Sequence, residues 1–472
     1  MEHSDELTED VDAGEMRVGR EGDDALQRIR NRCMMSDLLS ARSQMGMSLC
    51  FHIIFAVIGV SLPLMMTIAE LQWLRTREPV YRILAKRWAK GAAILFAIGA
   101  VSGTVLSFEL GLLWPRFMEK AGSVVGMPFS LEGFAFFTEA IFLGIYLYGW
   151  DRTPELIHLL SGAVVAMSGL ISAIFVTFVN AWMNTPSGFT LVNGEFTAVE
   201  PMKAMFSPAA IPEAVHMVLA AYCAAGFAIA GVHSWLMLRR GRNRFDEVAI
   251  GIALSVGGVA VLAQGVSGDA LARMVARTQP VKLASLEGQF QTEAGAPLRI
   301  GGLPDEKQRT TRYALEIPHG LSLLAFHDPD ALVKGLDDFP QEDWPRVPLV
   351  HLSFQVMVGL GSVLTLVALL GGWLAWKRKP LTAHRRYLQL LVLCGPLGFI
   401  ALEAGWMVTE LGRQPWIIFG ILRTRDAVTK VQHLQIPFVL ASALYCVLGV
   451  MVVWLLAVHV IADPQNRDAD AV

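Results

Sequence analysis

Two glutamates stand seven residues apart in a segment that is otherwise apolar enough to cross a membrane. They are Glu132 and Glu139, in PFSLEGFAFFTEAIFLGIYLYGW. Seven residues of an α-helix come within about 20° of two full turns, so both carboxylates lie on one helix face, about 10 Å apart along its axis. Ionisable groups inside a membrane are costly and usually functional, and stacked carboxylates are typical of a proton relay. The structural alternative for Glu139 is a carboxyl group bonded to a Ser or Thr of a neighbouring helix.

Other polar or sulfur-bearing side chains interrupt apolar runs in the same way. His52 lies in SLCFHIIF, His216 in PEAVHMVLA and Met357 in SFQVMVGLG. An imidazole and a thioether can ligate haem iron from opposite faces, and helix bundles often enclose such cofactors. Each of these residues taken alone could equally be a packing residue of a helix core. Glu403, in ALEAGW, is either a neutral hydrogen-bonded acid or a hard ligand for ferric iron.

Their common depth favours function over packing. Counted at about 1.5 Å per residue from the outer ends of their helices, these side chains fall in one layer, roughly 10 Å below the outer surface. Glu132 and Glu109 belong to the same layer. His158, in ELIHLL, lies near the opposite end of its helix. A route from His158 through Glu139 to Glu132 would lead cytoplasmic protons to a site in this layer.

The composition defines the solvent in which these elements fold. Hydrophobic residues make up 54% of the 472 residues and charged residues only 17%, which is typical of an integral membrane protein. The net charge of −3 gives no support to a nucleic-acid partner. The five cysteines are scattered, which favours neither a disulfide framework nor a CxxC metal site.

The apolar runs predict an all-α polytopic membrane protein with about nine transmembrane helices. The predicted spans are 45–72, 91–115, 127–150, 156–183, 211–237, 248–268, 347–375, 387–409 and 434–461. Basic loops at 75–90, 239–244 and 377–386 lie on one side, which we assign to the cytoplasm, so the N-terminus is expected outside and the C-terminus inside. Between the spans of 35–268 and those of 347–462, residues 269–346 form an outside loop. Residues 1–34 are expected to be a disordered acidic extension and residues 463–472 a cytoplasmic tail.

Five motifs then resemble one family. GWDR (149–152), LEGFAFFTEA (131–140), VNAWMNTPSG (179–188), EAGW (403–406) and GRQPW (412–416) occur in this order and on these spans. The chain resembles subunit I of the cytochrome bd-type quinol oxidases over residues 35–462, and in particular the short-loop, cyanide-insensitive branch. That resemblance implies a multi-pass protein of the bacterial inner membrane that oxidises quinol outside and reduces dioxygen with cytoplasmic protons, without pumping.

The resemblance also implies roles for individual residues. His52 is similar to the ligand of the oxygen-reducing haem, Glu403 to the carboxylate ligand of a second high-spin haem, and the pair of His216 and Met357 to the ligands of low-spin haem b. Glu132, Glu139 and His158 correspond to the proton path, and Lys282 and Glu287 to quinol-oxidising residues of the 269–346 loop. The remaining cofactor-binding residues implied are Arg42 and Arg413, as propionate partners, and Trp416 of the GRQPW motif.

The family pattern implies cofactors and partners as well. The cofactors are a low-spin haem b, a high-spin haem b, and either haem d or a third haem b; the substrates are dioxygen and ubiquinol or another quinol. A second membrane subunit is expected, with room for a small single-span accessory subunit. Two departures stand out: Gln355 replaces an Arg of better-known members, and the spacing from Glu132 to Glu139 is one residue shorter than in some of them.

Two other functions remain open from the residues alone. A haem-free proton-coupled transporter also needs intramembrane carboxylates and histidines, although it needs no methionine at their depth. A haem-b quinol dehydrogenase without oxygen chemistry would share the low-spin ligands. A visible absorption spectrum and an oxygen-uptake assay separate these alternatives.

Overall fold

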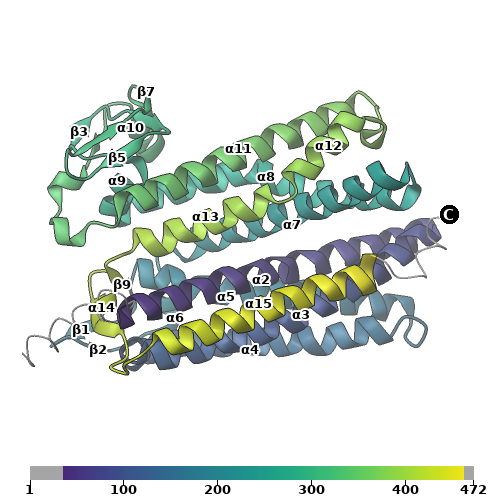
Figure 1. Cartoon of the computed structure of the whole chain (residues 1–472), viewed down its shortest axis with the longest axis horizontal. Coiled ribbons are helices and arrows are strands. Elements are labelled where there is room, and N and C mark those ends of the chain that lie inside the picture. Colours follow the sequence, from purple (N-terminus) through teal and green to yellow (C-terminus); the bar gives the residue numbers. More distant parts are fainter. Residues whose placement is uncertain (1–35, 462–472) are drawn as a thin grey trace, which may run out of the picture.

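The computed structural model describes residues 36–461, so the predicted extension 1–34 and tail 463–472 lie outside the described residues. Within this range nine helical segments are long and apolar enough to span a membrane, as predicted (Figure 1). They are α2 (Asp37–Thr76), α3 (Pro79–Leu113), α4 (Pro115–Tyr148), α5 (Glu155–Asn184), α7 (Ala210–Arg240), α8 (Arg244–Thr278), α11 (Val347–Trp376), α12 (Arg385–Cys394) with α13 (Leu397–Gly412), and α15 (Gln435–Leu456), which ends in a π-helical turn at Ala457–Ile461.

Very short links make sequence neighbours pack as antiparallel pairs. Residues 77–78 join α2 to α3, Trp114 alone joins α3 to α4, and residues 241–243 join α7 to α8. Proline at the first position of α3 and α4 has no N–H to leave unpaired, so each helix can begin directly after the previous one ends. At the start of α8, the Asn243 side chain accepts a hydrogen bond from the Asp246 amide (2.8 Å).

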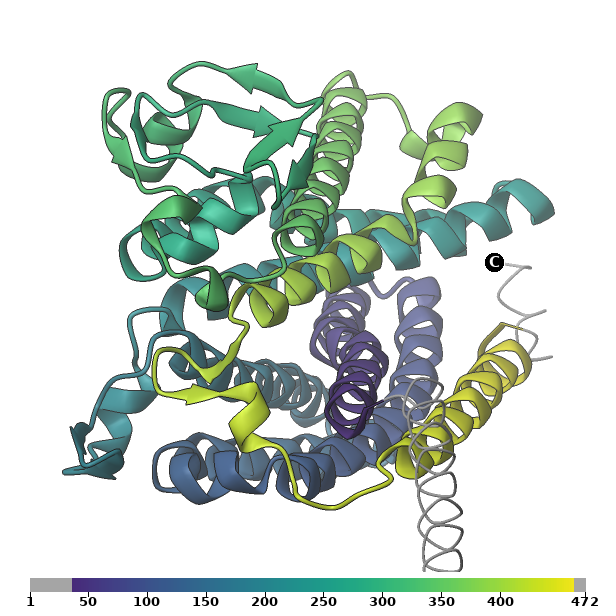
Figure 2. The same ribbon diagram turned by 60° about the vertical axis from the view of Figure 1, so that its left-hand side comes forward.

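The helices form two groups. In Figures 1 and 2, α2, α3, α4, α5 and α15 lie together, while α7, α8, α11, α12 and α13 form the other group. Helices α2 and α5 pack against α7 across the boundary, and α13 packs mainly against α7 and α11. Many apolar side chains of α4, α11 and α15 face outward, such as Phe137, Leu366 and Val450. Such surfaces suit lipid or another membrane subunit rather than water.

The non-membrane elements gather at one end of the bundle (Figure 1). Helix α9 (Pro280–Glu287) is followed by three two-stranded antiparallel sheets and helix α10 (Gly320–Phe326). The strand pairs are β3 (Glu293–Ala294) with β8 (Leu332–Val333), β4 (Leu298–Ile300) with β7 (Leu315–Ile317), and β5 (Leu303–Asp305) with β6 (Thr310–Arg312). Two 3-10 turns, Leu336–Asp338 and Gln341–Asp343, lead into α11.

Further short elements complete the chain. At the same end lie β1 (Thr190–Val192) with β2 (Glu195–Thr197), α6 (Pro201–Met205), β9 (Trp416–Ile418) with β10 (Leu422–Arg423), and α14 (Thr424–Ala427). A 3-10 turn at Leu381–Ala383 precedes α12. The predicted outside loop 269–346 is therefore largely structured, and its first ten residues continue α8.

Several helices are longer than predicted. The basic run 75–90 was expected as a loop, but α3 already begins at Pro79, and α4 begins at Pro115 rather than near residue 127. Hydropathy marks the lipid boundary, whereas a helix can continue beyond it into water. The eighth span is broken at Gly395–Pro396, because proline has no N–H to continue the helical hydrogen bonds. Helix α7 comes close to the chain at this break: a Cβ on Gly231 would lie 3.0 Å from the Gly395 Cα.

Candidate functional site

His52 is held by a serine of the neighbouring helix. Its Nδ1 lies 3.1 Å from the Ser102 hydroxyl, and that hydroxyl donates to the Ile98 carbonyl oxygen (2.9 Å). Ser102 therefore accepts from Nδ1–H, which leaves the lone pair of the imidazole on Nε2. A Cβ on Gly103 would lie 3.0 Å from Cε1, so the glycine keeps space beside the ring. This is the arrangement of a metal-binding histidine oriented by its second nitrogen.

His216 has the same kind of support. Its Nδ1 lies 3.0 Å from the Ser267 hydroxyl of α8, which donates to the Gln264 carbonyl oxygen. The Gln264 amide lies 3.0 Å from Nε2, so a metal at that nitrogen would displace one hydrogen bond. Gly268 borders the ring, since a Cβ there would lie 3.5 Å from Cε1.

Met357 faces a glycine across the interface of α11 and α13. A Cβ on Gly405 would lie 3.1 Å from the Met357 sulfur. The sulfur therefore lies against bare backbone, with no side chain between the two helices at this point. Gln355, two residues earlier, bonds the Arg299 carbonyl oxygen (3.0 Å) and the Gly301 amide (2.9 Å). The departure at this position thus ties α11 to the segment of β4 instead of supplying a cation.

Two carboxylates lie on one face of α13, seven residues apart. Both carboxylate oxygens of Glu403 are buried and have no hydrogen-bond partner among the described residues. Glu410 accepts a short hydrogen bond from the Asn180 amide and pairs with Arg413 (Nη2 to Oε2, 2.6 Å). Buried oxygens without partners are rare and point to a missing donor or cation.

Glu132 and Glu139 face α5, as their common helix face predicts. The Ser172 hydroxyl donates to Glu132 Oε1 (3.2 Å). Glu139 is buried against Gly169, where an added Cβ would lie 3.2 Å from Oε2. The described hydrogen bonds give Glu139 no Ser or Thr partner, so the structural alternative for this carboxyl group gains no support.

His158 is buried but is not aimed at Glu139. Its Nδ1 lies 2.7 Å from Glu70 Oε1, and its Nε2 donates to the Tyr146 carbonyl oxygen (2.9 Å). Both ring nitrogens are therefore occupied. Sequence reasoning missed Glu70, although an acid in the apolar run MMTIAEL was a signal of the same kind as Glu139.

Lys282 and Glu287 are buried on the short helix α9. The Lys282 ammonium donates to the Asn184 side-chain oxygen (3.1 Å) and packs against Gly412 of the GRQPW motif. Burial lowers the pKa of Lys282 to about 8, and burial likewise raises the pKa of Glu287 to about 8. Glu287 Oε2 and both polar atoms of the Gln279 side chain have no partner among the described residues. The Glu287 oxygen and the Gln279 amide therefore have bonding capacity left for a polar ligand.

Two arginines near this end have unmet bonding capacity. Arg413 is buried, yet its Nε and Nη1 have no described partner. Arg42 forms no ion pair with the described residues, and the charge closest to it is another cation, Arg346, which the sequence did not single out. Trp416 stacks under Arg423, with the guanidinium 4.6 Å from its ring. The unused donors of Arg413 and the charge of Arg42 fit anionic groups such as the carboxylates of a cofactor.

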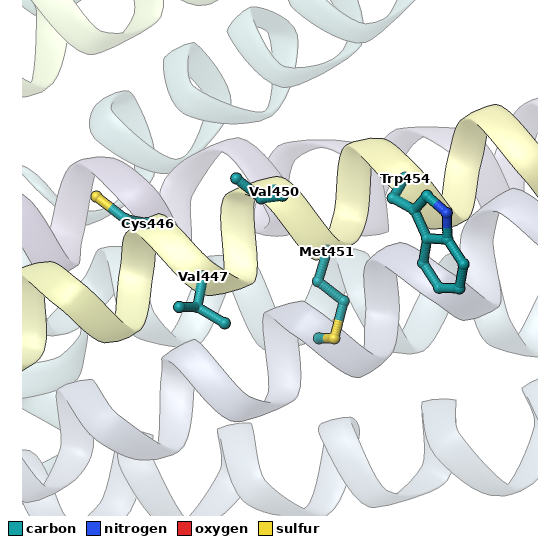
Figure 3. Close-up of a pocket in the computed structure, with 5 residues that line it drawn as sticks. All are labelled: Cys446, Val447, Val450, Met451 and Trp454. Carbon is teal, nitrogen blue, oxygen red and sulfur yellow. The ribbon is translucent and has the colours of Figure 1, made fainter.

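Two negative findings help to define the site. No cluster of three or more His, Cys, Asp or Glu side chains capable of holding a bare metal ion occurs within residues 36–461. A shallow apolar hollow lies on α15, lined by Cys446, Val447, Val450, Met451 and Trp454 (Figure 3). It contains none of the residues described above and is not the site of chemistry.

Comparison with known proteins identifies the chain. Residues 40–464 match the family described as cytochrome bd terminal oxidase subunit I. The chain belongs to this family. The solved bd oxidase of Geobacillus thermodenitrificans is 40% identical, with a TM-score of 0.86, over 91% of this chain and 99% of that one.

Named relatives agree with this assignment. A protein of Bacillus subtilis (strain 168), provisionally named a cytochrome bd menaquinol oxidase subunit I, is 39% identical over 92% of this chain and 99% of its own length. The cytochrome bd-II ubiquinol oxidase subunit 1 of Escherichia coli (strain K12) is 29% identical over 88% of this chain and 94% of its own length. This bd oxidase subunit is thus a multi-pass protein of the bacterial inner membrane and part of a quinol oxidase, which rules out the transporter and the oxygen-independent dehydrogenase.

The described residues of the bd oxidase subunit fit haem. His52 offers a lone pair on Nε2, Glu403 offers oxygens without partners, and glycines border His52, His216 and Met357. Arg413 has N–H donors without partners in this part of the chain, and they can bind haem propionates. Among the described residues, Arg42 has a positive charge without an anionic partner, which can do the same. The donor set, an imidazole with a thioether and single hard or nitrogen ligands elsewhere, is that of haem iron rather than of a bare ion.

Proposed function

We propose that this subunit oxidises quinol at the end of the bundle that carries α9 and reduces dioxygen to water with protons drawn from the opposite, cytoplasmic side. Charge then separates across the membrane without a pumping element. The observation that carries the proposal is the set of buried polar atoms that the fold leaves without partners among the described residues: the Glu403 oxygens, Nε and Nη1 of Arg413, the side-chain amide of Gln279 and the free nitrogen of His52.

The ligand residues follow from their free atoms and from the family. His216 and Met357 would hold the low-spin haem b between α7 and α11. His52 would hold the haem at which dioxygen is reduced, either haem d or a further haem b. A carboxylate of α13 would hold the other high-spin haem b. When bound, these haems supply one-electron redox chemistry and an open iron position for dioxygen.

The α13 carboxylate has two candidates. Glu403 matches the ligand through its two oxygens without partners. Glu410, on the same face, already pairs with Arg413 and Asn180. We assign the ligand to Glu403 because the Cys50 thiol beside its carboxylate is only a weak donor, whereas binding at Glu410 would have to break bonds to Arg413 and Asn180.

Lys282 and Glu287 would act on the quinol. Both are buried on α9, so each can contact part of a quinol that is shielded from water. An ionised Glu287 can accept a hydroxyl proton, while Lys282 donates to a ring oxygen and holds it in place. Arg42 and Arg413 would pair with haem propionates. Glu132 and Glu139 would carry protons from the other side of the membrane.

Haem counting tests the ligand assignments. The purified complex with His52→Ala should retain the low-spin haem signal but lose quinol-driven oxygen uptake, because only the oxygen-reducing site loses its ligand. Glu403→Gln should lack one high-spin haem by pyridine haemochrome analysis, while Glu410→Gln should retain all haems. Wild-type oxygen uptake in His52→Ala, or haem loss in Glu410→Gln alone, would contradict the corresponding assignment.

A further inference from the structure

A buried cluster of three side chains lies at the end of the bundle opposite α9. Glu70 comes from α2, His158 from α5 and Tyr146 from α4, and their side chains are almost fully buried. Glu70 Oε1 lies 2.7 Å from His158 Nδ1, and the rings of Tyr146 and Trp150 lie 4.5 and 4.2 Å from the imidazole. The cluster thus joins α2, α4 and α5 through buried polar groups.

The bonding of His158 allows it to hold a proton. Both neighbours of its ring, a carboxylate oxygen and the Tyr146 carbonyl oxygen, are acceptors. Nε2 therefore keeps its hydrogen, and the proton between Nδ1 and Glu70 can reside on either partner. The pair consequently exists either as imidazolium with carboxylate or as imidazole with carboxylic acid, and it can accept a further proton on the carboxylate.

A second pair of the same kind behaves differently. His233 Nδ1 lies 2.7 Å from Asp246 Oδ1, with both side chains buried. Here the Trp88 N–H, which can only donate, points at His233 Nε2 (3.4 Å), and the Asn243 amide donates to Asp246 Oδ2 (2.7 Å). Every atom of this pair is used, and His233 is fixed as neutral imidazole. The pair of His233 and Asp246 therefore holds α3, α7 and α8 together.

The Glu70 cluster, by contrast, contains polar atoms whose hydrogen-bonding capacity is unused. Glu70 Oε2 and the Tyr146 hydroxyl are both buried and have no hydrogen-bond partner among the described residues. The hydroxyl lies within electrostatic reach of the Glu70 carboxylate. Buried polar atoms without partners are rare, and they are typical of sites that bind water or pass protons.

The cluster continues along one helix face. Tyr146 stands seven residues after Glu139, as Glu139 stands seven residues after Glu132. These three polar side chains therefore form a line on α4, with steps of about 10 Å. On α5, Gly162 and Gly169 face the line: an added Cβ would lie 2.6 Å from the Tyr146 ring and 3.2 Å from Glu139 Oε2, respectively.

We propose that Glu70 and His158 form a buried proton-holding pair that supplies Glu139 through the Tyr146 hydroxyl. This inference rests on the proposed function, in which Glu139 receives protons for water formation. It revises the route expected from the sequence, because the nitrogens of His158 are turned to Glu70 and the Tyr146 backbone instead of to Glu139. Glu70 and Tyr146 become proton-relay residues of the reaction.

The proton balance closes without another reactant. A proton from water binds to the pair, which then passes one proton to the hydroxyl oxygen of Tyr146. That hydroxyl releases its own hydrogen towards the Glu139 carboxylate, two helical turns along α4, a step that needs a bridging water. The pair and the hydroxyl return to their initial states, and Glu139 ends as a carboxylic acid.

Glu70→Gln tests the pair in the purified two-subunit complex. The amide keeps the size of the side chain and an acceptor for His158 but cannot take up a proton. We expect oxygen uptake to slow by at least about tenfold, in line with the loss of an acid–base group. Haem content and the rate at which quinol reduces the low-spin haem without oxygen should not change. Asp246→Asn, in the closed pair, is the matched control and should keep the wild-type rate.

Tyr146→Phe is the second variant, and it separates relay from structure. Because the hydroxyl has no partner, its removal should leave the melting temperature unchanged or raised. Oxygen uptake should still fall. This variant also decides the matter if Glu70→Gln does not assemble with its haems. Wild-type oxygen uptake in Tyr146→Phe, or equal slowing in Asp246→Asn and Glu70→Gln, would overturn the proposal.

Glu139→Gln separates a failure of this inference from a failure of the proposed function. Slowed uptake in Glu139→Gln together with a normal Glu70→Gln would reject the pair and leave the proposed proton path intact. The reverse result would show that protons from the pair bypass Glu139, which would reject both. Slowing in both variants, with normal haem reduction, supports both.

Discussion

At the level of single residues, Glu287 makes a prediction about pH. Burial raises its pKa to about 8, so below that pH the group keeps its proton and cannot accept one from quinol. Above it, the carboxylate forms and can accept. We expect kcat/KM for quinol to rise with pH through about 8, and Glu287→Gln to remove that rise. Oxygen uptake at low quinol concentration across this range measures it.

The control for this prediction comes from the same loop. Asp330 is exposed and lies near His319 (3.5 Å). None of its described contacts is to Glu287 or Arg299, so Asp330→Asn should keep the wild-type pH profile. Lys282 also titrates near this pH, since burial lowers its pKa to about 8. A Glu287→Gln profile that still rises through the same pH would therefore transfer the effect to Lys282 and refute the role of Glu287.

Residue types were predictable from the sequence, but their partners were not. A histidine in an apolar run is visible in SLCFHIIF, whereas the hydroxyl that orients it belongs to Ser102, fifty residues later. Gln264 and Glu70 were missed for the same reason, because their importance lies in contacts between helices. Depth along a helix can be counted from a sequence, but rotation towards a particular neighbour depends on packing.

At the level of helices, the pair α7–α8 depends on two glycines. A Cβ on Gly226 would lie 2.6 Å from the Gly257 Cα and 2.8 Å from the Ala253 carbonyl oxygen, all backbone atoms that cannot move aside. We expect Gly226→Ala to cost about 1–3 kcal/mol through overpacking. Because His216 and Ser267 face each other across this pair, the low-spin haem spectrum should shift as the melting temperature falls.

Gly251→Ala is the matched control for the helix pair. It lies on α8 with no atom within 4 Å of an added Cβ, so it should leave the protein as stable as wild type or slightly more so, because alanine favours helix. Equal melting temperatures for the two variants would show that the close approach of α7 and α8 does not limit stability.

Helix number was predictable while helix ends were not. Nine apolar runs correctly predicted the nine spans found within residues 36–461, because in lipid a single segment of this length satisfies its backbone groups as a helix. The predicted helix ends were wrong where a run of charged residues was interpreted as a loop, as at 75–90. Arg82 and Lys86 in this run are compatible with a helix that extends into water. The small sheets of residues 293–333 were also beyond prediction, since strands of two or three residues carry no clear periodicity.

At the level of the whole molecule, the two proton reactions lie at opposite ends. His52 and Glu70 share α2 but stand eighteen residues apart, about 27 Å along the helix. Helix α9, with Lys282 and Glu287, follows the end of α8 at the end of the bundle that carries the sheets, whereas His158 lies in the first turn of α5, at the other end (Figure 1). In the proposed function, release and uptake of protons are therefore separated by the membrane.

This separation predicts the stoichiometry of the reconstituted complex. In sealed vesicles with a quinol analogue, as many protons as electrons should appear on the side of α9, because quinol releases its protons there and water formation consumes protons from the other side. A protonophore should abolish the acidification and speed oxygen uptake. More protons than electrons would require a pumping element, and none at all would mean that both reactions use the same side. Either result would refute the two-ended arrangement proposed for this subunit.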